Sequence, residues 1–231
     1  MIAGILQVRH ANHFGSNSKT IPLWLKLIFT VQFFASIFYN LFTDNAESLL
    51  WFCNVAIILM FFAVWSNNRL LISIVTVSII GPQLVWQVDY FFRVFTGDSL
   101  LGNTDYMFDP RVSLFGKLIS LFHIWMPYLL LYSLYITGYD KRAFRFQCII
   151  ACLVLIISYL ATSSMFGKGG NLNMVYGPDS YSPQTWMPGW LWLFGGMAYC
   201  CICIYLPTHF ILKKMFRRNN IAGTNFVMSN S

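Results

Sequence analysis

The stretch LLISIVTVSIIGPQLVWQVDYFFR (residues 70–93) carries only two charged side chains, Asp89 and Arg93, and both lie near its end. It is long enough to cross a bilayer, because a hydrocarbon core of ~30 Å needs ~20 mainly apolar residues in a helix. Similar apolar runs fill most of the chain. Six of them cover residues 21–42, 49–65, 70–95, 113–137, 144–162 and 189–212. Backbone groups in lipid must be hydrogen-bonded within their own segment, so we predict a helix for each run.

The composition agrees with a membrane protein. Hydrophobic residues make up 57% of the chain and charged residues 10%, whereas a soluble domain carries about 25% charged residues. We therefore predict an all-α polytopic membrane protein, a bundle of six transmembrane helices in one domain spanning residues 21–212. A lead-in (1–20) precedes this domain and a basic tail (213–231) follows it.

The basic residues are sorted by side, and this predicts the topology. Ten of the fifteen basic residues fall in the lead-in, the turn between runs two and three, the loop between runs four and five, and the tail. The other three loops hold six of the eight acids. Short loops rich in Lys and Arg stay cytoplasmic, so we expect both termini in the cytoplasm. The net charge of +7 is then an insertion signal, and we expect no nucleic-acid partner.

All six cysteines fall within the apolar runs. Cysteines inside a membrane seldom form a disulfide framework, so we expect free thiols. Cys200 and Cys203 have the Cx2C spacing of a zinc site, but the chain has no second such pair to complete four ligands. We predict no metal site and no cofactor.

Polar side chains inside a span are costly in lipid and are therefore functional candidates. Gln83 and Gln87 stand four residues apart, so they share one face of the third predicted helix. They follow Gly81 and Pro82, where we expect a kink because proline removes a backbone donor. The two amides suit either a polar cavity or hydrogen bonds between helices. For Asp89 we favour an ion pair with Arg93.

The fourth run carries His123, with Pro127 four residues later, and the second run carries Cys53 next to Asn54. The structural interpretation is a buried, hydrogen-bonded histidine and a packing cysteine. The catalytic interpretation pairs them, because a thiol becomes a nucleophile when a nearby imidazole takes its proton.

A long loop, residues 163–188, joins the last two runs and contains Asn171, Asn173 and Tyr176. Loops of this length in compact proteins are often functional. This one would suit a cap folded over a cavity mouth. Its aromatic residues would equally suit anchorage at the lipid headgroups.

The pattern WFCN (51–54), the pattern HIWMP (123–127) and a Tyr-Gly-Pro loop (176–178) before the last of six spans resemble one family. This is the androgen-induced/androgen-dependent family of intramembrane lipid hydrolases, with its cysteine-bearing acyltransferase branch. The resemblance implies chemistry on fatty-acyl esters, with Cys53 as nucleophile and His123 as base. A cysteine in place of the hydrolases' threonine fits the acyltransferase branch and leaves both hydrolysis and transfer open.

The site predicted in this way is catalytic at Cys53 and His123 and takes a membrane lipid or another lipophilic substrate. Its candidate substrate-binding residues are Asn54, Gln83, Gln87, Asn171, Asn173 and Tyr176. Two other classes of function remain open. A transporter or permease would use the polar residues of the third helix as a path. A non-catalytic membrane scaffold would use the region of Gly195, Gly196 and Cys200–Cys203 as a helix-packing face.

Overall fold

The computed structural model describes residues 20–43, 45–163, 170–178 and 182–216, and in these ranges the regular structure is entirely helical. Most of the predicted lead-in (1–19) and of the predicted basic tail (217–231) lies outside the described residues.

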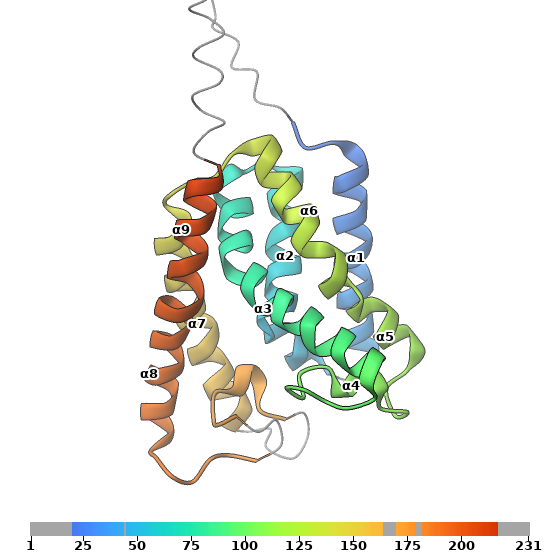
Figure 1. The fold of residues 1–231 in the computed structure, drawn as a ribbon, viewed down its shortest axis with the longest axis vertical. Helices are drawn as coiled ribbons and strands as arrows, with labels where there is room; N and C mark the ends of the chain where they lie inside the picture. Colours follow the sequence, from blue (N-terminus) through green and yellow to red (C-terminus); the bar gives the residue numbers. More distant parts are fainter. Residues whose placement is uncertain (1–19, 44, 164–169, 179–181, 217–231) are drawn as a thin grey trace, which may run out of the picture.

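Longer helices form the body of the molecule, and short ones lie in the connections (Figure 1). The longer elements are α1 (Leu23–Phe42), α2 (Phe52–Trp65), α3 (Arg69–Thr96), α6 (Phe122–Thr137), α7 (Ala143–Ser163), α8 (Gly189–Tyr199) and α9 (Leu206–Met215). The short ones are η1 (Ala46–Leu50), α4 (Asp105–Phe108), α5 (Leu114–Ser120) and η2 (Leu172–Met174), while η3 (Cys200–Tyr205) joins α8 to α9.

Five helices of the described chain are long and apolar enough to cross a membrane. They are Leu23–Phe42, Arg69–Thr96, Leu114–Thr137, Ala143–Thr162 and Gly189–Met215. The second predicted run differs, because its regular α-helix, α2, has only 14 residues. At ~1.5 Å per residue this helix is shorter than a bilayer core of ~30 Å. The 3₁₀ turn η1 covers the two residues, Leu49 and Leu50, at the start of that run.

Helix α3 is the centre of the bundle. It packs against α2, α6, α7, η3 and α9, and its buried side chains include Ile72, Val75 and Val77. Many apolar side chains on the outer helices point outward, among them Val31 at 69% exposed, Phe42 at 85% and Leu160 at 65%. An apolar exterior around a packed interior is what a lipid environment favours.

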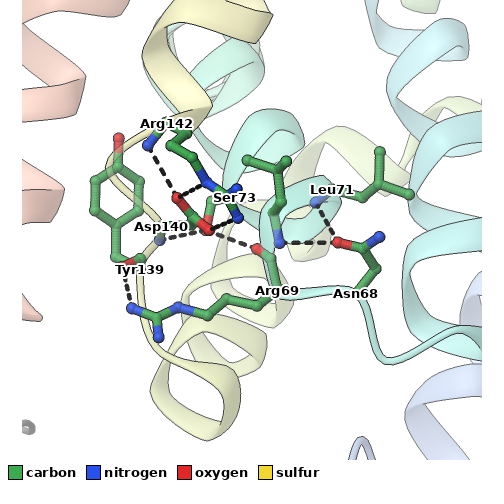
Figure 2. Close-up of polar contacts among 8 residues, drawn as sticks. Asn68, Arg69, Leu71, Ser73, Tyr139, Asp140 and Arg142 are labelled. Atoms are coloured by element: carbon green, nitrogen blue, oxygen red, sulfur yellow. Dashed lines mark hydrogen bonds and ion pairs between the residues drawn. The ribbon is translucent and has the colours of Figure 1, made fainter.

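One end of the bundle, called here the loop end, carries η1, α4, η2 and the start of α8 (Figure 1, lower part). The opposite end is fastened by polar contacts between the start of α3 and the loop after α6 (Figure 2). Asn68 caps α3 by accepting from the N–H groups of Leu70 and Leu71. Ser73 Oγ accepts from Asp140 N–H at 2.9 Å, and Arg69 donates to the carbonyl of Tyr139.

Three prolines lie inside these helices, and the backbone conformation near each one is different. Pro82 lies within α3 without ending it, although Figure 1 shows the second half of α3 running obliquely to the first. The predicted fourth span, residues 113–137, is interrupted at Leu121, six residues before Pro127. In the last span, Pro207 follows the π-helical segment η3, where Leu206 N–H donates to Cys201, five residues back. Proline cannot make the normal bond to the fourth residue before it, so local rearrangement at these points is expected.

Candidate functional site

His123 is the second residue of α6, directly after the interruption at Leu121. Its Nδ1 lies 2.8 Å from the carbonyl oxygen of Ser120. A carbonyl only accepts, so Nδ1 carries the proton and Nε2 keeps its lone pair. The imidazole also stacks on the indole of Trp86, with ring centroids 4.7 Å apart. The ring is therefore fixed in both orientation and tautomer.

Gln87 is bonded to the same interrupted helix. Its Nε2 donates to the carbonyls of His123 at 2.8 Å and Ile124 at 3.2 Å, and its Oε1 accepts from the Tyr128 hydroxyl at 3.0 Å. The His123 carbonyl is the one that Pro127, four residues on, leaves without its usual helical donor. Gln87 therefore makes hydrogen bonds between helices, which is one of the two interpretations that the sequence allowed.

Gln83, one turn earlier on α3, has a poorer set of partners. Its Nε2 lies 3.7 Å from Met126 Sδ, and its Oε1 is buried with no hydrogen-bond partner among the described residues. The indole Nε1 of Trp86, three residues along α3, is likewise buried and unpartnered in the described chain. Such atoms are uncommon in native proteins, and each calls for an explanation.

Tyr106, on α4, brings its hydroxyl to this region. The hydroxyl is within interaction range of Ser120, of Cys53 and of the Trp86 indole. The contact with the indole does not reach hydrogen-bond geometry. Burial raises the pKa of Tyr106 to about 12. The hydroxyl therefore stays protonated and can donate at any physiological pH.

Helix α4 is held in place by α3. The carboxylate of Asp89 is fully buried and accepts from Leu101 N–H at 2.7 Å. It also accepts from the N–H and the hydroxyl of Thr104, both at 2.9 Å. Arg93 pairs with Asp105 on α4. The predicted ion pair between Asp89 and Arg93 is therefore wrong. N–H groups and a hydroxyl of the loop donate to the carboxylate of Asp89. Arg93 pairs instead with Asp105 of the same loop.

Cys53 is the second residue of α2 and is partly buried against the core. The N–H of Phe52 before it donates to Asn173 Oδ1 at 3.1 Å. Asn173 Nδ2 donates to the carbonyl of Leu50 at 2.9 Å and to Ser158 Oγ on α7 at 2.8 Å. The loop before the last span thus fixes the start of the helix that carries the thiol.

The other predicted binding residues also bond within the protein. Asn54 donates to the carbonyl of Ser48 at 2.7 Å. Asn171 donates to the carbonyl of Gly177 and accepts from the N–H of Tyr176. Tyr176 stacks on Tyr159, with centroids 4.3 Å apart, and donates to its carbonyl. These contacts shape the loop end, and they occupy amide donors that the sequence offers as substrate ligands.

The structure thus relates Cys53 and His123 through shared neighbours. The thiol interacts with Tyr106, the phenol lies beside Trp86, and Trp86 stacks on the imidazole. We call Cys53, Trp86, Tyr106, Ser120 and His123 the loop-end cluster. Sequence reasoning missed Tyr106, Trp86 and Ser120. The position of Trp86 three residues after Gln83 is a signal for that residue, whereas no spacing in the sequence indicates that Tyr106 lies within electrostatic range of Cys53.

The loop-end cluster holds no Asp, Glu, Lys or Arg side chain, so its chemistry would have to begin from a neutral thiol and a neutral imidazole. Within the described ranges, no group of three His, Cys, Asp or Glu side chains is arranged to hold a metal ion.

Comparisons with known proteins give no relative: no protein-family model, no curated protein and no solved structure matches the chain at a significant level.

Proposed function

We propose that the chain is a multi-pass integral membrane protein that crosses the bilayer six times, with both termini in the cytoplasm. Five helices long and apolar enough to span support this proposal. The sixth span would be α2 extended by η1, because the two elements follow each other with only Trp51 between them. The distribution of basic residues among the loops supports the orientation. The loop end would then face away from the cytoplasm.

Within this frame we propose an enzyme that acts on fatty-acyl esters, using Cys53 as nucleophile and His123 as base. The observation that supports it best is the bond from His123 Nδ1–H to the Ser120 carbonyl. This bond leaves Nε2 as a proton acceptor, which is the arrangement that a histidine base needs. The proposal needs no cofactor, and its substrate would be a membrane lipid or another lipophilic ester.

The chemical step balances with these two groups. His123 Nε2 takes the proton of Cys53, and Sγ bonds to the acyl carbonyl carbon. The carbon–oxygen bond to the alcohol then breaks, and the imidazolium returns the proton to the departing oxygen. The resulting acyl-thioester passes to water or to another hydroxyl, giving hydrolysis or transfer.

Reaction of the thiols with an electrophile tests this proposal. Purified protein in detergent is treated with a long-chain chloroacetamide, and the labelled cysteines are identified by mass spectrometry. A base-activated thiol reacts faster than a packing thiol, so we expect labelling mainly at Cys53. Cys203, which is exposed, and Cys201 serve as internal controls.

The dependence on the base is measured with His123→Asn. The shorter amide retains a donor for the Ser120 carbonyl but has no proton acceptor at the Nε2 position. We expect Cys53 labelling to fall to the level of the control cysteines. The proposed enzyme activity would be contradicted if Cys53 were labelled no more than Cys201. It would also be contradicted if Cys53 were labelled equally in the unaltered protein and in His123→Asn.

A second candidate, a non-catalytic membrane scaffold, is favoured by one observation. Gly195 and Gly196 on α8 have nothing from the described residues within 4 Å of where a Cβ would lie, so this face is open to another helix. Crosslinking of α8 to a neighbouring helix with a methylene-bridged reagent, carried out in native membranes, would detect such a partner. The transporter is not supported, because Gln87 and Asp89 already form hydrogen bonds within the protein instead of lining a path.

A further inference from the structure

Acyl transfer from an ester creates a negative charge on the carbonyl oxygen, and an enzyme stabilises it with donors aimed at that oxygen. The amide donors that the sequence offers are already used. Gln87 donates to the carbonyls of His123 and Ile124, and Asn173 donates to Leu50 and Ser158. Donating from either amide to a substrate would break a bond that holds a helix end in place.

Two other donors belong to the loop-end cluster, and the described chain shows no bond from either of them to a backbone carbonyl. The indole N–H of Trp86 is unpartnered in the described chain, although the residue is only 6% exposed. The Tyr106 hydroxyl interacts with the side chains of Ser120 and Trp86, and it is within electrostatic range of the Cys53 thiol. Both belong to side chains whose other contacts, the stack on His123 and the packing of α4, would survive loss of the polar atom.

We infer that Trp86 Nε1–H and the Tyr106 hydroxyl form the oxyanion-binding pair of the loop-end cluster and donate together to the carbonyl oxygen of the acyl group on Cys53. The inference rests on the proposed thiol chemistry and names two further catalytic residues for it. It also explains a buried N–H without a partner, because the missing acceptor is supplied by the substrate.

Asp89 takes a defined part in this arrangement. Its buried carboxylate binds the loop residues Leu101 and Thr104, and Tyr106 follows Thr104 by two residues. Asp89 is therefore a positioning residue, since it fixes α4 against α3 and so sets the Tyr106 hydroxyl beside the Trp86 indole.

The test compares two reactions of the same thiol in the full-length protein. Alkylation by a long-chain chloroacetamide displaces chloride at a saturated carbon and forms no oxyanion. Acylation by a long-chain p-nitrophenyl ester passes through a tetrahedral oxyanion and releases p-nitrophenol. Trp86→Phe keeps a ring to stack on His123, and Tyr106→Phe keeps the packing of α4. Trp125→Phe and Tyr132→Phe are the matched controls.

We expect acylation of Cys53 to slow by ~10²–10³-fold in Trp86→Phe and in Tyr106→Phe, which is the usual effect of removing one oxyanion donor. Alkylation should stay within about threefold of the unaltered protein in both variants, and the two controls should change neither rate.

Other outcomes separate the two proposals. If the unaltered protein alkylates at Cys53 in a His123-dependent way but both variants acylate at the normal rate, the oxyanion pair is overturned and the proposed function stands. If both rates fall together in the variants, the two residues are structural and the inference is again overturned. If the unaltered protein shows neither selective alkylation nor acylation of Cys53, the proposed function itself fails and the inference fails with it.

Discussion

Gln83 and Gln87 stand one turn apart on α3 and differ in what their amides touch. Gln87 bonds to two backbone carbonyls and to one hydroxyl. Gln83 has only a sulfur contact and an unpartnered Oε1 in the described chain. The energetic value of a buried amide depends on these partners, since a lost partner costs more than a bond contributes.

This contrast gives a prediction for the two glutamines. Gln87→Leu leaves the His123 carbonyl, which Pro127 cannot bond, without its donor, so we expect the free energy of unfolding to fall by about 1–3 kcal/mol. Gln83→Leu removes an atom that lacks a partner and should be neutral or slightly stabilising. Thermal unfolding in detergent measures both variants side by side. Equal losses would show that Gln87 is not a structural donor.

Among the elements, the interruption between α5 and α6 organises the loop end. The carbonyl of Ile119 accepts from Gln32 on α1 at 3.3 Å, that of Ser120 accepts from His123, and that of His123 accepts from Gln87. Side chains thus satisfy the carbonyls that the broken helix leaves open, as burial in an apolar bundle requires. The polar residues of these spans therefore have a structural role as donors to backbone carbonyls, in addition to any catalytic role.

Restoring the missing backbone donor should therefore lessen the need for Gln87. In Pro127→Ala, residue 127 regains an N–H that can donate to the His123 carbonyl. We expect Gln87→Leu to cost less stability in this background, with a coupling of about 0.5–3 kcal/mol in a double-mutant cycle. The cycle is measured by unfolding in detergent. Pro207→Ala, in α9, is the control background. Additive effects of Pro127→Ala and Gln87→Leu would show that Gln87 does not replace the backbone donor that is missing at Pro127.

For the whole molecule, the two ends differ in structure and in charge. The loop end carries the buried carboxylate of Asp89 and the ion pair of Arg93 with Asp105. The opposite end carries Arg69 and Arg142, both bonded to the loop after α6 (Figure 2). Cysteines introduced at each of the two ends can therefore be labelled without disturbing the core.

The proposed orientation predicts the outcome of such labelling. Single cysteines introduced at Asn103 and Gly177 should react with an impermeant maleimide from outside the cell. Cysteines at Lys141 and Lys214 should react only after the membrane is opened, because basic loops stay cytoplasmic. Both measurements use intact cells and a cysteine-free background. Reaction of Lys141→Cys and Gly177→Cys from the same side would rule out the six-span topology.

The apolar runs by themselves determined the helical class and the outer limits of several long helices. Residues 21–42 correspond to α1 and residues 144–162 to α7 within a residue or two. The reason is that a bilayer selects length and hydrophobicity, and both are properties of a single segment. The free state of the thiols in the described chain also agrees with what their positions in the runs predict.

The partners of polar side chains were decided by tertiary structure alone. The sequence pairs Asp89 with Arg93 because they are four residues apart, yet the loop returning over α3 offers Asp89 three donors and Arg93 another acid. The same return of the chain brings Tyr106 within electrostatic range of Cys53. Hydrogen bonds act over a few ångströms in space, so the site depends on how distant segments meet, which no local pattern contains.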